Sequence, residues 1–468
     1  MKKLFSLILS LMAGFIASCG GGYGGDSSTS SASALFGDGP KALKPAQAQC
    51  TITVEDYDRN GSIDNADIQT ALNTARENNQ DDVVCIPAGT YNITNTLTYN
   101  LSSNSSECGK KLTIRAVGGD VILDGGNSVR ILSIHTSSCS DDANGDITIE
   151  GITFQNGESS SGSGGGLFVS VVKANITLTN NTFSNNSAYY GGGAYAYSDS
   201  GSVTLTNNTF SNNISGYGGG AYAYSDSGSV TLTNNTFSNN SAYHGGGASA
   251  WSQTGSVTLT NNTFSNNHAN YGGGGGAYAY SLSGSVTLTN NTFSNNTASG
   301  GGGGAYAYSL SGSVTLTNNT FSNNTASGGG GVSAWSQTGS VTLTNNTFSN
   351  NTASGGGGAS AWSQTGSVTL TNNTFSGNNA GYEGGGAYVG SDSGSITLTN
   401  NTFSSNNAGY EGGGAYVRLY YNAATLHFYN NILWNNTANA NGDDLYVDND
   451  GDEDNTPSPV NLAHNLFS

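Results

Sequence analysis

Basic residues are scarce in this sequence. Only 12 Lys and Arg stand among 468 residues, against 30 Asp and Glu, and the formal net charge is −18. Such a chain cannot neutralise a phosphate backbone, which excludes a nucleic-acid partner. Proline is rare, with 5 residues, and the 70 glycines follow no strict triplet period, which excludes collagen. Aromatic residues make up 10% and hydrophobic residues 35%, which is too rich for a disordered tract.

Long apolar runs are absent except near the N-terminus. Residues 4–16 are mostly apolar and follow a short basic start, but they are too short to cross a bilayer comfortably. This arrangement is typical of an export signal. The Ile-Ala-Ser-Cys sequence at 16–19 resembles the bacterial lipoprotein cleavage box, which implies removal of residues 1–18 and a lipid on Cys19. The alternative is an ordinary cleaved signal with an unrelated cysteine.

Residues 19–49 are rich in Gly and Ser and show almost no apolar periodicity. We expect them to form a flexible tether between a membrane and a folded body. The sequence therefore predicts an exported lipoprotein, held at the outer membrane or cell surface through its N-terminal lipid.

Cysteine occurs at five positions, and the four beyond Cys19 are Cys50, Cys85, Cys108 and Cys139. An even number in an exported chain predicts two disulfides. Sequence allows three connectivities, and we expect Cys50–Cys85 with Cys108–Cys139 because neighbouring cysteines close the cheapest loops. A zinc site is the alternative, but the sequence has no Cys-x-x-Cys spacing.

A repeat fills the second half of the chain. From residue 181 the sequence cycles through variants of NTFSNN, a Gly-rich stretch ending in AYAY, and SGSVTLTN. Phenylalanines mark the period at intervals of 27 to 30 residues, with Leu433 in the last place. They are Phe154, Phe183, Phe210, Phe237, Phe264, Phe293, Phe321, Phe348, Phe375 and Phe403. This period is typical of a solenoid.

The pattern inside one unit predicts strands. Apolar residues alternate with Thr at 203–206, and no window shows apolar residues spaced three and four apart. Three short strands are expected in each unit, around residues 203–205, 209–210 and 221–223, separated by Asn-rich and Gly-rich turns. Such units stack into a parallel β-helix of about 13 coils.

Comparison among the copies predicts which side chains face inward. Alanines recur at the places of Ala194 and Ala196, while the residue between them is Tyr or Ser. A packed core would not tolerate that exchange, so these side chains face outward. The first Asn of each Asn-Asn-Thr-Phe turn, from Asn180 to Asn400, is expected to form an amide ladder, with solvated turns as the alternative.

One outward column consists of aromatic residues and is the candidate ligand-binding site. Its members are Tyr197, Tyr224, Trp251, Tyr280, Tyr308, Trp335 and Trp362. Their flat faces suit sugar rings or another protein. The alternative is that they shield the strand backbones.

The Gly-Gly-Gly-Ala and Phe-Ser-Asn-Asn segments resemble the GGAI and FxxN repeats of polymorphic outer-membrane proteins. Residues 66–468 as a whole resemble the pectate-lyase-like superfamily, including an opening helix at 67–75 followed by a strand at 83–91. The resemblance implies an all-β, right-handed parallel β-helix solenoid with three short strands per coil and an N-terminal capping helix. The expected divisions are 50–170 for the cap and first coils, 171–420 for the repeats, and 421–468 for the last coils and C-terminal cap.

Lyases of that superfamily use a Lys or Arg base beside calcium-holding carboxylates, and its hydrolases use clustered Asp. The central coils lack this chemistry, because no Lys or Arg lies between Lys173 and Arg418. The residues left for an enzyme lie in the early coils: Arg115, Asp120, Asp124, Arg130 and His135. The sequence thus favours binding, adhesion or a structural role in the cell envelope. A polysaccharide lyase or glycoside hydrolase is the alternative, with no catalytic residue assigned.

An acidic segment suggests calcium. Residues 56–67 fit the calcium-loop template with Gly61 at the sharp turn and resemble one half of a dockerin-type loop and helix. The candidate ligands are Asp56, Asp58, Asn60, Ser62, Asp64 and Asp67. The alternative is a polar turn in which Asp64 or Asp67 caps the helix. Residues 448–454 resemble acidic calcium repeats more loosely.

Overall fold

The computed structural model describes residues 49–103, 105–139, 141–420, 424–450 and 458–468. The chain divides into two units, residues 1–48 and 49–468, and the description below concerns the second. The predicted signal peptide, Cys19 and nearly all of the predicted tether lie outside the described residues. No helix within the described part of the chain is both long enough and apolar enough to cross a membrane.

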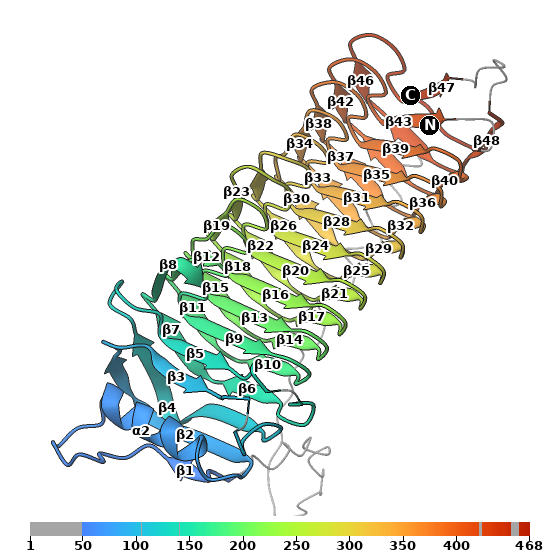
Figure 1. Cartoon of the computed structure of the whole chain (residues 1–468). Coiled ribbons are helices and arrows are strands. Elements are labelled where there is room, and N and C mark those ends of the chain that lie inside the picture. The colour runs from blue at the N-terminus through green and yellow to red at the C-terminus, as the bar shows by residue number, and fades with distance from the viewer. Residues whose placement is uncertain (1–48, 104, 140, 421–423, 451–457) are drawn as a thin grey trace, which may run out of the picture. The chain divides into compact units, whose positions relative to one another are not determined.

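The second unit is a parallel β-helix, as the sequence predicts (Figure 1). One coil of the repeat holds β14 (Val203–Thr206), β15 (Thr209–Ser211) and β16 (Ala221–Ser225), which are the three strands expected from the pattern. Each pairs in parallel and in register with its counterpart one coil on. Some coils add a fourth strand of two residues, such as β19 (Ser241–Ala242).

The first two strands of each coil join one 26-stranded sheet. This series includes β1 (Ile52–Thr53), β2 (Asp82–Asn92), β4 (Leu112–Asp124), β6 (Ile147–Glu150) and β7 (Ile152–Gln155), and it continues to β44 (Leu426–Tyr429), β45 (Ile432–Trp434) and β48 (Val460–Ala463). The described strands of this sheet pair in parallel with strands of neighbouring coils, so the sheet has no hairpins among them.

The third strand of each coil joins a 13-stranded sheet, which carries the aromatic residues. In order its strands are β3 (Leu97–Asn100), β5 (Leu132–His135), β9 (Leu167–Val171), β13 (Ala194–Ser198), β16, β20 (Ala248–Ser252), β24 (Ala277–Ser281), β28 (Ala305–Ser309), β31 (Val332–Ser336), β35 (Ala359–Ser363), β39 (Ala387–Ser391), β43 (Ala415–Tyr420) and β47 (Leu445–Asp450).

The predicted capping helix is α2 (Asn65–Ala75), which lies at the blue end of Figure 1. Its buried apolar residues are Ile68, Ala71, Leu72 and Ala75, at the helical spacing seen in the sequence. They pack on β2 and β3 and cover the first coil. The divisions proposed at residues 170 and 420 stay predictions.

The interior consists of the predicted Val, Leu, Phe and Ala. Each repeat Phe is fully buried, and successive rings stack with centroids about 5 Å apart, for example 4.8 Å between Phe183 and Phe210. Leu433 takes the same buried place in the coil after Phe403. Burying such a side chain stabilises the fold by about 1.5–3 kcal/mol before conformational entropy is subtracted.

The amide ladder exists, but the prediction that the first Asn of each pair forms it is wrong. Asn207 adopts a left-handed backbone with φ of 56°, and the second residue, Asn208, enters the core. The left-handed residue turns the chain at the bend, and this turn points the next side chain inward. A second ladder, absent from the prediction, runs through Asn186, Asn213 and their counterparts.

Close approach of backbones explains the Gly-Gly-Gly segments. Gly218 has φ of 64°, and a Cβ there would lie 2.2 Å from the carbonyl oxygen of Ala221. At Gly219 a Cβ would lie 2.2 Å from the carbonyl oxygen of Gly246 in the next coil. Any larger residue would force successive coils apart at this corner.

Candidate functional site

Two columns of side chains cover the outer face of the 13-stranded sheet. The first column follows the initial Ala, Val or Leu of each strand. Its members are Phe168, Tyr195, Tyr222, Ser249, Tyr278, Tyr306, Ser333, Ser360, Tyr388, Tyr416 and Tyr446. The second column, two residues further on, holds the seven predicted aromatic residues from Tyr197 to Trp362, followed by Gly390 and Arg418. Both columns point outward, as predicted.

The rings of these columns stack along the sheet. In the first column Tyr195 and Tyr222 lie 5.5 Å apart with planes 2° from parallel. In the second column Tyr224 and Trp251 lie 4.6 Å apart. Stacking covers much of each ring, so Tyr222 is only 7% exposed although it faces outward. Burial also raises the pKa of Tyr195 to about 12, so its phenol is neutral at physiological pH.

Two acids of the central coils, Asp199 and Asp226, interact with these rings. Asp226 accepts hydrogen bonds from the hydroxyl groups of Tyr197, at 2.9 Å, and Tyr224. Burial, together with hydrogen bonds to Asp199 and Asp226, raises the pKa of Tyr197. Asp226 therefore fixes two members of the second column.

The first column changes from Tyr to Ser in three coils, and in each of them the second column carries Trp. The pairs are Ser249 with Trp251, Ser333 with Trp335, and Ser360 with Trp362. The simplest explanation is that the larger indole fills the space of the missing phenol. It does not, because a hollow of about 390 Å³ remains beside Ser249 and one of about 250 Å³ beside Ser333 and Ser360. We call these the first and the second hollow.

A third column walls the first hollow. Tyr190, Tyr217 and His244 precede the strands and stack on one another, with 5.2 Å between the rings of each neighbouring pair. The edge of His244 meets Tyr278 at 5.8 Å. Burial lowers the pKa of His244, so its ring is neutral at pH 7. This column was not predicted from the sequence, because His244 breaks the tyrosine pattern and the preceding loop varies in length.

The structure shows the contacts of the five residues named for an enzyme. Arg115 on β4 forms an ion pair with Glu150. Arg130 donates to the Gly164 carbonyl at 3.2 Å, and the His135 ring stacks on Phe168 at 6.4 Å. Asp120 is exposed in the turn within β4.

Asp124 accepts hydrogen bonds from Gln155 at 2.8 Å and from Asn156 and the Gly126 backbone. Burial alone would raise its pKa, but these hydrogen bonds outweigh burial and lower it. Asp124 is thus a carboxylate that fastens neighbouring coils together. Arg130 also lies over the Phe168 ring, 4.9 Å from its centroid, so Arg130 and His135 contact the same side chain.

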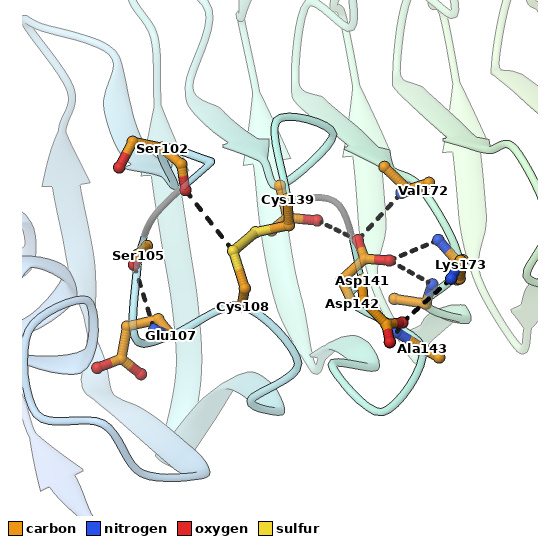
Figure 2. Close-up of a disulfide and its surroundings, with 12 residues drawn as sticks. Ser102, Ser105, Glu107, Cys108, Cys139, Asp141, Asp142, Ala143, Val172 and Lys173 are labelled. Atoms are coloured by element: carbon orange, nitrogen blue, oxygen red, sulfur yellow. Dashed lines mark hydrogen bonds and ion pairs between the residues drawn. A yellow bond between two sulfur atoms is a disulfide. The ribbon is translucent and has the colours of Figure 1, made fainter.

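Both disulfides form with the predicted connectivity, Cys50–Cys85 and Cys108–Cys139. Figure 2 shows the second, which joins the loop after β3 to the loop after β5. Next to it Asp142 is 2% exposed and accepts hydrogen bonds from the backbones of Val172, Lys173 and Ala174. The disulfide and this carboxylate hold irregular loops that lack the repeat sequence.

The acidic loop before α2 contains the predicted helix cap. Asp64 caps the helix, and Asp67 accepts from the backbones of Asp64 and Tyr57. The carboxylates of Asp56, Asp58 and Asp67 also offer oxygens within 4.8 Å of one another. Backbone amides of Asn60 and Gly61 donate to Asp56 and fold the loop around these oxygens. Oxygen donors of this kind fit Ca²⁺.

In the second acidic segment, Asp448 is engaged by protein groups. It accepts from the Tyr416 hydroxyl at 2.6 Å and pairs with Arg418 at 3.4 Å. Residues 451–457 lie outside the described part of the chain.

A solenoid of parallel coils with outward aromatic columns defines this protein as a β-helix repeat protein. The family model for the right-handed β-helix region matches residues 62–293 and 282–451. The chain therefore belongs to the right-handed β-helix family, which confirms the handedness expected from the sequence resemblance. No curated protein matches the sequence.

Several solved structures are similar to parts of this chain. ORF18 of Geobacillus virus E2 is 15% identical with a TM-score of 0.34, and the match covers 69% of this chain and 55% of that protein, about half its length. The GH87 α-1,3-glucanase catalytic unit of Streptomyces thermodiastaticus is 14% identical with a TM-score of 0.36, covering 87% and 70%. PfbA, a surface adhesin of Streptococcus pneumoniae, is 12% identical with a TM-score of 0.31, covering 85% and 93%. Because the identities and TM-scores are low, we assign none of those activities to this chain.

Proposed function

We propose that this protein is a surface-displayed binding or adhesion protein, or a structural element of the cell envelope. We further propose that the aromatic face of the 13-stranded sheet is its contact surface. The observation that supports this is the ordered stack of outward rings with two hollows between them. Partly covered aromatic faces offer large apolar contacts at low conformational cost. The binding partners that we propose are glycans or surface proteins.

The test compares adhesion of the full chain with that of a variant carrying Trp251→Ala, Trp335→Ala and Trp362→Ala. We expect the wild-type protein to adhere to a glycan array or to immobilised surface proteins, and the triple variant to lose at least tenfold in affinity. The control replaces outward threonines of the same coils on the other sheet, namely Thr258, Thr342 and Thr369, by Ala. Equal binding by all three proteins, or no binding by the wild type, contradicts the proposal.

We also propose that Cys19 carries a lipid that anchors the protein at the outer membrane or cell surface, and that the repeats are kin to those of polymorphic outer-membrane proteins. The signal-like residues 1–18 support export, and the two disulfides fit an oxidising compartment. Replacing Cys19 with Ser should release the protein from the membrane fraction and abolish labelling by a fatty acid. Retention of both would contradict the anchor.

For the acidic loop we propose a structural calcium site. Asp56, Asp58 and Asp67 would hold the ion, aided by the oxygens of Asn60, Ser62 and Asp64. Calcium would neutralise three carboxylates that lie close together and would fix the loop against α2. In this role it stabilises the cap and takes part in no reaction.

The alternative function is a polysaccharide lyase or glycoside hydrolase. Release of reducing sugars or unsaturated products from acidic glycans, abolished by Asp120→Asn or Arg115→Lys, would establish it. The engagement of Arg115 and Asp124 in inter-coil contacts makes this the second candidate.

A further inference from the structure

The first hollow lies where one ring is missing from the first column. Tyr195 and Tyr222 stack on one side of it and Tyr278 and Tyr306 on the other, at 5.5 and 5.1 Å. Ser249 occupies the place of the ring between them and is 4% exposed, so it forms the floor. Successive coils are ~4.8 Å apart, so the rings of Tyr222 and Tyr278 are separated by about two coil spacings. A flat or puckered six-membered ring fits between them with both faces covered.

The side walls are aromatic as well. Trp251 and Tyr280 line one side and meet edge to face at 5.5 Å, while Tyr217 and His244 line the other. Side chains thus wall the space on four sides above the Ser249 floor, and the hollow opens to solvent.

The chemistry of the lining is amphipathic and uncharged. Five tyrosines, His244, Ser249 and Trp251 line the hollow, and no Lys, Arg, Asp or Glu is among the lining residues. Burial raises the pKa of Tyr222 and Tyr278 and lowers that of His244, which keeps these groups neutral. Apolar faces with hydroxyl groups at their edges match a sugar ring, whose C–H faces are apolar and whose edge carries hydroxyls.

The charge of the surroundings excludes an acidic sugar. No Lys or Arg occurs between Lys173 and Arg418, and the whole chain carries −18. A uronate or sulfated sugar would meet no cation in the hollow and would be repelled by the protein's field. A cationic ligand would gain from the rings but would find no carboxylate in the lining.

We propose that the first hollow is a subsite for one neutral pyranose unit of a glycan, held between Tyr222 and Tyr278 with Trp251 beside it. This deepens the proposed function and rests on it. The second hollow lies three coils further along the same sheet, ~14 Å away. It lacks two rings in succession, at Ser333 and Ser360, and is flanked by Tyr306, Trp335 and Trp362. A glycan running along the sheet reaches both.

The test fills the hollow using side chains that the chain itself uses at this position. Ser249→Tyr restores the first column, and Ser249→Tyr with Trp251→Tyr reproduces the Ala-Tyr-Ala-Tyr segment of the next coil, 277–280, so this double variant keeps the fold. The control Thr258→Tyr adds the same ring to the other sheet of the same coil. Tryptophan fluorescence and calorimetry follow binding to neutral oligosaccharides of glucose, mannose, galactose and N-acetylglucosamine, to oligogalacturonates, and to choline.

We expect at least one neutral oligosaccharide to bind the wild type and the Thr258→Tyr control equally. Both filled variants should lose at least tenfold in affinity with unchanged melting temperatures. Unchanged affinity in the filled variants overturns the subsite, and so does preference for oligogalacturonate or choline. If the full chain binds no glycan but adheres to immobilised proteins through its tryptophans, the proposed function stands and this inference is wrong.

Discussion

The side-chain oxygen of Asn235 accepts two hydrogen bonds from Asn208 of the preceding coil, from its backbone N–H at 2.9 Å and from its amide at 3.0 Å. The same amide of Asn208 also donates to the carbonyl of Leu178 at 2.8 Å. Each Asn of the ladder thus joins three coils. Its amide donates to the coils on both sides, and its side-chain oxygen accepts from the preceding coil. This arrangement explains how polar side chains can occupy the core of the helix.

Removal of one rung should therefore be costly. Asn235→Ala leaves the backbone N–H of Asn208 buried without a partner, and we expect a loss of about 1–3 kcal/mol in the free energy of unfolding. Urea denaturation of the full chain measures it. The control Asn234→Gly keeps the left-handed turn, φ 55°, and should cost far less. Equal losses in the two variants would mean that the ladder contributes nothing specific.

The phenylalanine stack gives a second prediction. Phe264 lies 4.8 Å from both Phe237 and Phe293, with 0% exposure. Phe264→Ala opens a cavity in the core and should destabilise the protein by about 3–5 kcal/mol. Phe264→Leu should cost less than about 1.5 kcal/mol, because Leu433 already fills the equivalent place. Thermal unfolding compares the two, and a leucine variant as unstable as the alanine variant would contradict this account of the core.

The third prediction concerns the acidic loop. Millimolar CaCl₂ should raise the melting temperature of the full chain, and EGTA should reverse the rise, since an ion that binds only the folded state stabilises it. Asp56→Asn with Asp58→Asn should remove the calcium response, because two of three clustered carboxylates are lost. The exposed Asp120→Asn serves as the control and should respond like the wild type. A calcium response that survives in the double variant would place the ion elsewhere.

The fourth prediction follows from His244. Burial holds its pKa below the ordinary value of 6.5, so the folded state resists protonation that the unfolded chain accepts. The stability contributed by the neutral ring is present above pH 6.5 and is lost as the pH falls from 6.5 toward the lowered pKa. His244→Tyr extends the Tyr190 and Tyr217 column without a titrating ring.

Melting temperatures of the two proteins between pH 7.5 and 5.5 provide the measurement. The wild type should lose more stability than His244→Tyr over this interval, while the many carboxylates affect both equally. Parallel curves would show that His244 titrates as a free imidazole does.

Much of the fold could be predicted because the copies of the repeat can be compared with one another, position by position. Ala194 and its counterparts stay small while Tyr195 and its counterparts vary, and that contrast alone separates the inward from the outward side chains. The same comparison misassigned the ladder, since Asn207 and Asn208 are equally invariant among the copies. Only the left-handed backbone of Asn207 shows which amide turns inward.

Only part of the candidate site could be predicted from the sequence. Trp251, Trp335 and Trp362 stood out in the sequence, but the serines beside them looked like neutral exchanges at a solvated position. A serine at this position leaves a hollow only if the neighbouring indole does not fill the space of the missing phenol. Whether it does depends on how the side chains of adjacent coils pack, which the sequence does not show.

The sequence by itself determined the coil, its period and its inward and outward sides, because strand alternation and repetition are local properties. The sequence allowed three pairings of the four described cysteines, and the structure selected Cys50–Cys85 with Cys108–Cys139. The tertiary structure alone decided which amide joins coils, how His244 comes to line the space above Ser249, and that this space stays open. Each of these depends on side chains that lie 27 or more residues apart along the chain and meet only when the coils stack.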